Sequence, residues 1–169
     1  MKKIFLVVIA FAMANVSMAQ SSPIDKLFDK YSGKEGYTSI FISKYMFNMF
    51  SSIDPDDKEL QGVLGGLSGI KILATQTPQI GINFYKEVMN ELSEKDYKEL
   101  MVIKEKDKDM KFLIKDVEGR VIELLLLIGG SENVLICIQG DNINMKNISN
   151  LSKSMNIDGL ENLEKINEQ

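Results

Sequence analysis

The stretch from Val121 to Ile128 limits the folds open to this chain more than any other segment. It is almost continuously apolar, and the only charge that interrupts it is Glu123. A short run of this kind is typical of a strand that is covered on both faces or lies in the centre of a sheet. We therefore expect Val121–Ile128 to be a central strand.

Three further segments around this run also have strand character. Tyr97–Glu105 is a strand candidate, Met110–Asp116 alternates apolar and polar residues, and Val134–Gln139 is apolar. Polar or glycine-containing turns separate them, at 106–109, 118–119 and 129–133. Four strands with such short links predict an antiparallel meander.

The first half of the chain alternates between helical and extended patterns. Ser22 and Pro23 are a typical helix start, and apolar residues follow at helical spacing up to Tyr31. The remaining expected elements are a strand at Tyr37–Ser43, a short buried helix at Lys44–Phe50, a helix that Asp54 caps, a strand at Ile70–Ala74, and a helix that opens at Thr77–Pro78.

These elements predict an α+β fold with a mostly antiparallel sheet, a C-terminal four-strand meander and helices packed mainly on one face. We expect the first two strands to pair in parallel, with a helical crossover between them. After the meander, Ile148, Leu151 and Met155 are spaced for a short helix against the sheet. The last residues, about 156–169, are polar and terminal, and we expect them to fray.

The N-terminus has the three-part pattern of a secretory signal peptide. Lys2 and Lys3 precede an uncharged apolar run at Ile4–Ala14, and Ser17 and Ala19 provide the small residues of a cleavage site. The alternative is an uncleaved N-terminal anchor, although the run is short for a transmembrane helix. We expect residues 1–19 to be removed, which leaves residues 20–169 as one domain, periplasmic or extracellular, with no later membrane span. No Cys lies near the cleavage site, so we expect no lipid anchor.

Composition excludes several kinds of chemistry. The chain has 169 residues with no His, one Cys and a formal net charge of -4. It therefore lacks His-based acid–base catalysis, zinc sites that need imidazole and any internal disulfide. The acidic balance disfavours nucleic-acid binding, and we expect no cofactor and no metal. The single Cys137 lies between isoleucines, which predicts a buried free thiol.

Five segments together resemble a known family. They are Phe41–Met46, Leu67–Leu73, Tyr97–Met101, Ile122–Leu127 and Val134–Ile136. In order and spacing they are similar to the DUF4252 proteins of Bacteroidota, whose function is unknown. The resemblance covers most of residues 20–169 and implies export and a small α+β domain. Many relatives look like envelope lipoproteins, and this chain differs from them in having no Cys at its cleavage site. The family supplies no reaction, ligand or catalytic residue.

Serine–lysine pairs and a group of acids are the first candidates for chemistry. Ser43 precedes Lys44, and Ser68 lies three residues before Lys71, but neither pair sits in a motif that would lower the pKa of the lysine. We therefore predict no catalytic residue. An acidic cluster suggests Ca²⁺ binding, but Pro55 occupies one intervening position and no Gly follows at the place that a calcium loop requires, and helix capping explains the acids. Its members are Asp54, Asp56, Asp57 and Glu59.

A group of glycines suggests a phosphate-binding loop. The expected Gly-Lys-Ser/Thr sequence is absent, however, because Ile70 separates Gly69 from Lys71. The segment also runs from helix into strand, whereas a phosphate loop leads into a helix. Helix termination and close packing are better explanations. The glycines concerned are Gly62, Gly65, Gly66 and Gly69.

Glu123 is the best single candidate for a functional carboxylate. Burying a carboxylate is unfavourable without a partner, so it either pairs with Arg120 or a lysine of a neighbouring strand, or faces solvent. A second candidate is a cluster that either packs into the core, which we favour, or forms a groove for a partner. Its members are Tyr45, Met46, Phe47, Met49 and Phe50.

The sequence therefore predicts an exported envelope protein that is a non-enzymatic binding module, with an envelope protein as its partner. One exposed edge of the meander would accept a strand. The alternatives are a small carboxylate-based hydrolase, which needs two converging acids, and a carrier of an apolar ligand.

Overall fold

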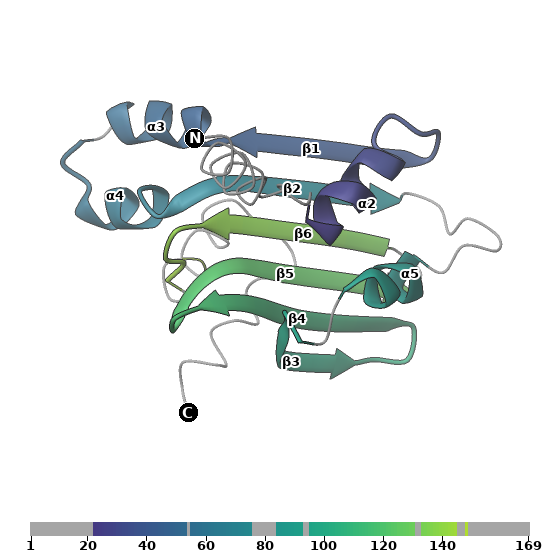
Figure 1. Cartoon of the computed structure of the whole chain (residues 1–169). Helices are drawn as coiled ribbons and strands as arrows, with labels where there is room; N and C mark the ends of the chain where they lie inside the picture. Colours follow the sequence, from purple (N-terminus) through teal and green to yellow (C-terminus); the bar gives the residue numbers. More distant parts are fainter. Residues whose placement is uncertain are drawn as a thin grey trace, which may run out of the picture.

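The computed structural model describes residues 22–53, 55–75, 84–92, 95–130, 133–144 and 148. Within them, six strands form one antiparallel sheet in the order β1-β2-β6-β5-β4-β3 (Figure 1). The strands are β1 (Tyr37–Ser43), β2 (Leu67–Thr75), β3 (Lys98–Lys104), β4 (Lys108–Val117), β5 (Arg120–Gly130) and β6 (Asn133–Gly140).

The last four strands occur where the sequence predicts them, and each is the neighbour of the next in the sheet. The hairpin between β4 and β5 shows why the links are short. Val117 faces Arg120, and the two residues between them, Glu118 and Gly119, have φ angles of 53° and 79°. Two successive positive φ angles are the geometry of a type I′ turn, which matches the twist of antiparallel strands.

The prediction that the first two strands are parallel is wrong. β1 and β2 are antiparallel, with Tyr37 opposite Thr75 and Ser43 opposite Gly69. The two helices between them lie at the end of the sheet where β1 finishes, and they turn the chain back beside β1 (Figure 1). A parallel pair would require the connection to return along the whole length of the sheet before β2 begins.

Two helices cover one face of the sheet, and the other two lie at one end and contribute to the apolar cluster of the opposite face (Figure 1). The prediction that the helices pack mainly on one face therefore holds for only two of those described. Because side chains of a strand point alternately to opposite faces, β5 belongs to two apolar clusters. Leu125 and Leu127 pack with residues of α2 and α5, whereas Leu124 and Leu126 pack with residues of α3 and α4. The helices are α2 (Pro23–Tyr31), α3 (Lys44–Ile53), α4 (Lys58–Leu64) and α5 (Phe84–Glu91).

Capping residues set where two of these helices begin. The Ser22 side chain accepts a hydrogen bond of 3.1 Å from the backbone N–H of Asp25, which confirms the predicted start of α2. The expected cap of α4 is wrong, because Asp57 rather than Asp54 accepts from the backbone N–H of Leu60, at 2.9 Å. Asp57 directly precedes Lys58, the first residue of α4, so its side chain reaches the free N–H groups of the first turn.

The helix α3 forms as predicted but is not buried. Phe47 is its only buried residue, whereas Tyr45 is 85% exposed. The helix lies at the end of the sheet rather than across a face, so a single side of it reaches the core (Figure 1). Its other large apolar side chains remain in contact with water.

Two predicted segments fall partly or wholly outside the described residues. The helix expected from Thr77–Pro78 is described from Phe84 onward, as α5, and the tail at 156–169 is not described. Ile148 is buried in the cluster that contains Phe47. Leu151 and Met155 lie outside the described residues, so the short helix expected there stays a prediction.

Truncation of Leu125 to alanine should destabilise the fold strongly. Leu125 is fully buried at the centre of β5, so the shorter side chain leaves a cavity in a packed cluster. We expect the free energy of unfolding to fall by about 2–5 kcal/mol in urea titrations followed by circular dichroism. The control Val117→Ala, at a partly exposed strand position, should cost less than about 1 kcal/mol. Equal losses for the two variants would contradict this account of the core.

Candidate functional site

Glu123 lies inside the protein, on the face of β5 that α2 and α5 cover. Its exposed fraction is 5%, and it is the buried charged residue of the central strand. It faces Lys115 on β4 and Gln139 on β6, and the register of β4 and β5 shifts directly after the Lys115 pair. Such a bulge increases the local twist and redirects the adjacent side chains.

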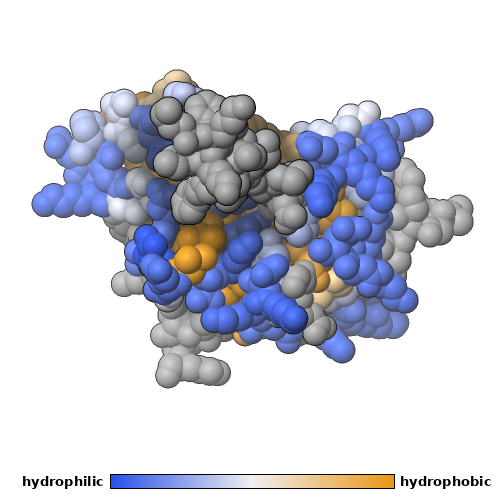
Figure 2. Space-filling view, viewed as in Figure 1, coloured by the Kyte–Doolittle hydropathy of each residue, from blue (hydrophilic) through white to orange (hydrophobic). Residues whose placement is uncertain are grey.

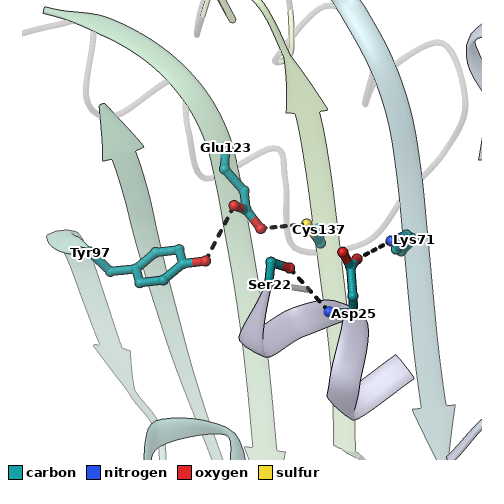
Figure 3. Close-up of polar contacts among 6 residues, drawn as sticks. All are labelled: Ser22, Asp25, Lys71, Tyr97, Glu123 and Cys137. Carbon is teal, nitrogen blue, oxygen red and sulfur yellow. Dashed lines mark hydrogen bonds and ion pairs between the residues drawn. The ribbon is translucent and has the colours of Figure 1, made fainter. Parts of the chain in front are cut away.

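Two donors bind the Glu123 carboxylate, and they come from two different parts of the sheet (Figure 3). The Tyr97 hydroxyl, just before β3, donates to Oε2 at 3.2 Å, and the Cys137 thiol of β6 donates to Oε1 at 3.0 Å. Burial is the main cause that raises the pKa of both Tyr97 and Cys137, and the nearby Glu123 carboxylate raises both pKa values further. Both donors therefore keep their protons at neutral pH.

This arrangement differs from the one expected for Glu123. The guanidinium of Arg120 pairs instead with Glu118, at 3.7 Å, and the ammonium of Lys115 lies over the Tyr97 ring, 5.8 Å from its centroid. The buried Glu123 carboxylate therefore has two neutral hydrogen-bond donors in place of a cation. A protonated, buried thiol is a weak nucleophile, so Cys137 is not prepared for covalent chemistry.

An ion pair continues this polar region toward α2. Lys71 of β2, which lies opposite Cys137 in the sheet, pairs with Asp25 (Figure 3). Its ammonium also lies 5.9 Å from the Phe28 ring centroid and 5.7 Å from that of Phe41. Lys71 thus joins α2, β2 and β1, and this ion pair ties the helix to the sheet.

A second polar cluster connects α2 to α5. The Glu87 carboxylate accepts hydrogen bonds from the Lys30 ammonium and from the Tyr31 hydroxyl. Burial acts to raise the pKa of Glu87, but these two donors outweigh it and hold the pKa below its ordinary value. Burial and the bond to Glu87 raise the pKa of Tyr31. The two helices that cover one face of the sheet are therefore bound to each other by charge-assisted hydrogen bonds.

A large apolar surface is exposed at one edge of the sheet. It belongs to the edge strand β1 and to α3, and we call it the β1–α3 surface. Figure 2 shows hydrophobic colour along the upper margin of the view, where α3 lies. Its exposed large side chains are Ile40, Phe41, Tyr45, Met46, Met49, Phe50 and Ile53.

The remaining sequence candidates are not assembled into a site. Ser68 is exposed on β2, and Lys71 pairs with Asp25 rather than with it. Ser43 ends β1 and Lys44 begins α3. Of the acidic cluster, Asp57 caps α4 and Asp56 is exposed, whereas Asp54 and the Glu59 side chain are not among the described parts.

The glycines after α4 serve close packing. A Cβ on Gly140 would lie 2.2 Å from the backbone oxygen of Gly66, and one on Gly66 would lie 3.1 Å from that of Asn142. The same Gly66 oxygen accepts a hydrogen bond of 3.0 Å from the N–H of Asp141. The start of β2 and the end of β6 thus approach too closely for side chains.

Sequence patterns alone did not identify Tyr97 and Cys137 as the partners of Glu123. Leu125 pairs with Cys137 and Glu123 pairs with Gln139, so Glu123 and Cys137 are diagonal neighbours on one face. Diagonal neighbours are within reach of long side chains. The sequence does show that Glu123 and Cys137 each interrupt an apolar strand. Whether the two side chains share a face depends on the register between β5 and β6, which the sequence does not give.

The described residues hold no group of three or more Cys, Asp or Glu side chains placed to bind a metal ion. Among those same residues, no helix combines the length and the apolar character that a membrane span requires.

Comparison with known families gives one result. The family model "Domain of unknown function (DUF4252)" matches residues 31–151, which include all six strands. The chain therefore belongs to the DUF4252 family. Neither the comparison with curated proteins nor the comparison with solved structures gave a match.

Removal of the Tyr97 hydroxyl should destabilise the protein, because it leaves the buried Glu123 carboxylate with one donor fewer. We expect Tyr97→Phe to lower the free energy of unfolding by about 1–3 kcal/mol in denaturant titrations. The same change at the exposed Tyr45 should have little effect. In a Glu123→Leu background the cost of Tyr97→Phe should largely disappear. An undiminished cost there would show that the two side chains are not coupled.

The Glu87 cluster predicts a loss of stability in acid. The folded-state pKa of Glu87 lies below its ordinary value of 4.5, so its stabilising contribution is complete above that value and is lost as pH falls through the folded pKa. We expect stability to decline below about pH 4.5, and less so in Glu87→Gln, when thermal unfolding is measured across this range. Glu105→Gln, at an exposed turn, is the control and should follow the parent. Parallel pH profiles for Glu87→Gln and the parent would contradict the assignment.

Proposed function

We propose that this chain is an exported envelope protein that acts as a non-enzymatic binding module, and that it binds its partner through the β1–α3 surface. The observation that carries the proposal is that seven large apolar side chains are exposed on one edge strand and the helix that follows it. Large exposed apolar areas on a soluble protein are typical of an interaction surface.

The two edges of the sheet support this assignment because they differ in chemistry. The edge strand β3 carries Lys98, Glu99 and Lys104, and two ion pairs join it to β4: Lys98 with Asp116 at 2.6 Å, and Lys111 with Glu99 at 2.8 Å. Charges of this kind discourage the addition of another strand. The edge strand β1 has no charged residue and no proline. The sequence predicted strand addition at an edge of the meander, and β1 at the other end of the sheet has the more suitable chemistry.

The environment of Glu123 supports a structural role for that carboxylate. Both of its oxygens already accept hydrogen bonds from donors that burial keeps protonated. A general acid or base needs access to the proton of a substrate. We therefore place the binding function at the β1–α3 surface rather than at Glu123.

Export is part of the proposal and rests on the N-terminal pattern of Lys2, Lys3 and the apolar run up to Ala14. Expression of the full chain in a bacterial host, followed by cell fractionation and N-terminal sequencing, tests it. We expect the protein in the envelope or medium with Gln20 as its first residue. A chain that keeps Met1 in the cytoplasm would refute export and leave the binding surface untouched.

The binding role can be tested with two variants that are closely matched. Ile40 and Val117 are strand residues with exposed fractions of 44% and 43%, and only Ile40 lies on the β1–α3 surface. Tagged parent, Ile40→Glu and Val117→Glu proteins would be cross-linked to the envelope fraction of the producing cell and purified. We expect the same bound proteins for parent and Val117→Glu, and their loss for Ile40→Glu. Equal capture by all three proteins would place binding elsewhere.

A further inference from the structure

We propose that the partner of the β1–α3 surface is a second copy of this chain, and that the two copies join by antiparallel pairing of their β1 strands around a two-fold axis. This inference rests on the proposed function, because it names the occupant of the same surface. Pairing would convert two six-stranded sheets into one continuous sheet.

The position of β1 supplies the geometry. Among the described residues β1 is the last strand of its sheet and pairs with β2 alone, so the backbone groups along its outer side have no strand partner there. A two-fold axis perpendicular to the sheet places two copies of one strand antiparallel, and the same patch serves both copies. Along Tyr37–Ser43 there is neither a proline to remove a donor nor a charge to repel its counterpart.

Charge favours a second copy over a charged partner. From Tyr37 to Ile53 the only charged residue is Lys44, although the whole chain has a formal net charge of -4. A strongly charged partner would find almost no counter-charge on this surface. In self-association, uncharged residues of one copy lie against uncharged residues of the other. The contact therefore leaves no charge without a counter-charge.

The exposed area is of the size that a dimer contact requires. Phe41, Tyr45 and Phe50 are 58%, 85% and 45% exposed. With about 150–250 Å² for each buried aromatic side chain, these three expose on the order of 400 Å², or roughly half of the ~800 Å² that one partner contributes to a standard interface. The other apolar members of the surface and the β1 backbone provide further area.

The charged β3 edge limits the assembly to two copies. Once the β1 strands have paired, the free edges of the joined sheet are the two β3 strands, which carry Lys98, Glu99 and Lys104. A further copy would have to pair with a charged edge, which is unfavourable. The contact is therefore closed, and we expect a dimer rather than a filament.

Sedimentation equilibrium tests the inference, on protein purified after expression of the full chain. Protein concentrations of about 1–100 µM would bracket a micromolar Kd for dimerisation. We expect a dimer for the parent and for Val117→Glu. Ile40→Glu should weaken dimerisation by about 100-fold, because it sets like charges opposite each other. Tyr45→Glu, at the most exposed position, is the second variant and is the least able to disturb folding. Circular dichroism would confirm that each variant is folded.

Disulfide trapping tests the strand pairing itself. Opposite residues of paired strands have Cβ atoms about 4.5–5.5 Å apart, so the position nearest the two-fold axis should cross-link to its own copy when replaced by cysteine. We expect this for one or two of Ser39→Cys, Ile40→Cys and Phe41→Cys, and not for Lys104→Cys on the β3 edge. The native Cys137 is buried and should not interfere.

The outcomes separate this inference from the function on which it rests. A monomeric parent, or a dimer that both Ile40→Glu and Tyr45→Glu leave intact, would overturn the second-copy assignment. If Ile40→Glu nevertheless loses a different envelope protein in the cross-linking experiment, the proposed binding function stands. If the parent is a dimer, Ile40→Glu is a monomer, and the cysteine copies of β1 cross-link, the second copy is the occupant.

Discussion

The burial of β5 on both faces is the constraint on which the rest of the structure depends. Its side chains from Leu124 to Leu127 are at most 1% exposed, and they point alternately to opposite sides of the sheet. Apolar surface of this extent must be removed from water on both sides. The chain meets the requirement by flanking β5 with β4 and β6, by covering one face with α2 and α5, and by packing residues of α3 and α4 into the cluster of the other face.

The same burial determines the chemistry of the interior. A carboxylate in a strand that is covered on both faces must find donors inside the protein, since little of it contacts solvent. Glu123 obtains them from Tyr97 and Cys137, on either side of β5, so that strands distant in sequence are joined by hydrogen bonds as well as by the ladder. The polar groups of this face hold its layers together, because Lys71–Asp25 and the Glu87 cluster add further links to α2 and α5.

The two edge strands of the sheet are left without a covering helix among the described residues. With α2 and α5 on one face and α3 and α4 at one end, no helix of the described residues lies along either edge strand (Figure 1). One edge, β3, is protected by charge, and the other, β1, is uncharged and continues into the exposed aromatic and methionine residues of α3. This asymmetry is the physical basis for the binding role that we propose for a member of the DUF4252 family.

The sequence by itself determined the secondary structure and the class of fold. The alternation of Met110–Asp116, the apolar run at Val121–Ile128 and the cap at Ser22 are local patterns, and local patterns depend only on neighbours in the chain. Only the tertiary structure decided the direction of β2 relative to β1, the position of each helix against the sheet, the partners of Glu123 and the exposure of α3. Each of these depends on which distant segments meet, and an apolar side chain such as Tyr45 or Phe47 has the same local pattern whether it faces the core or a partner.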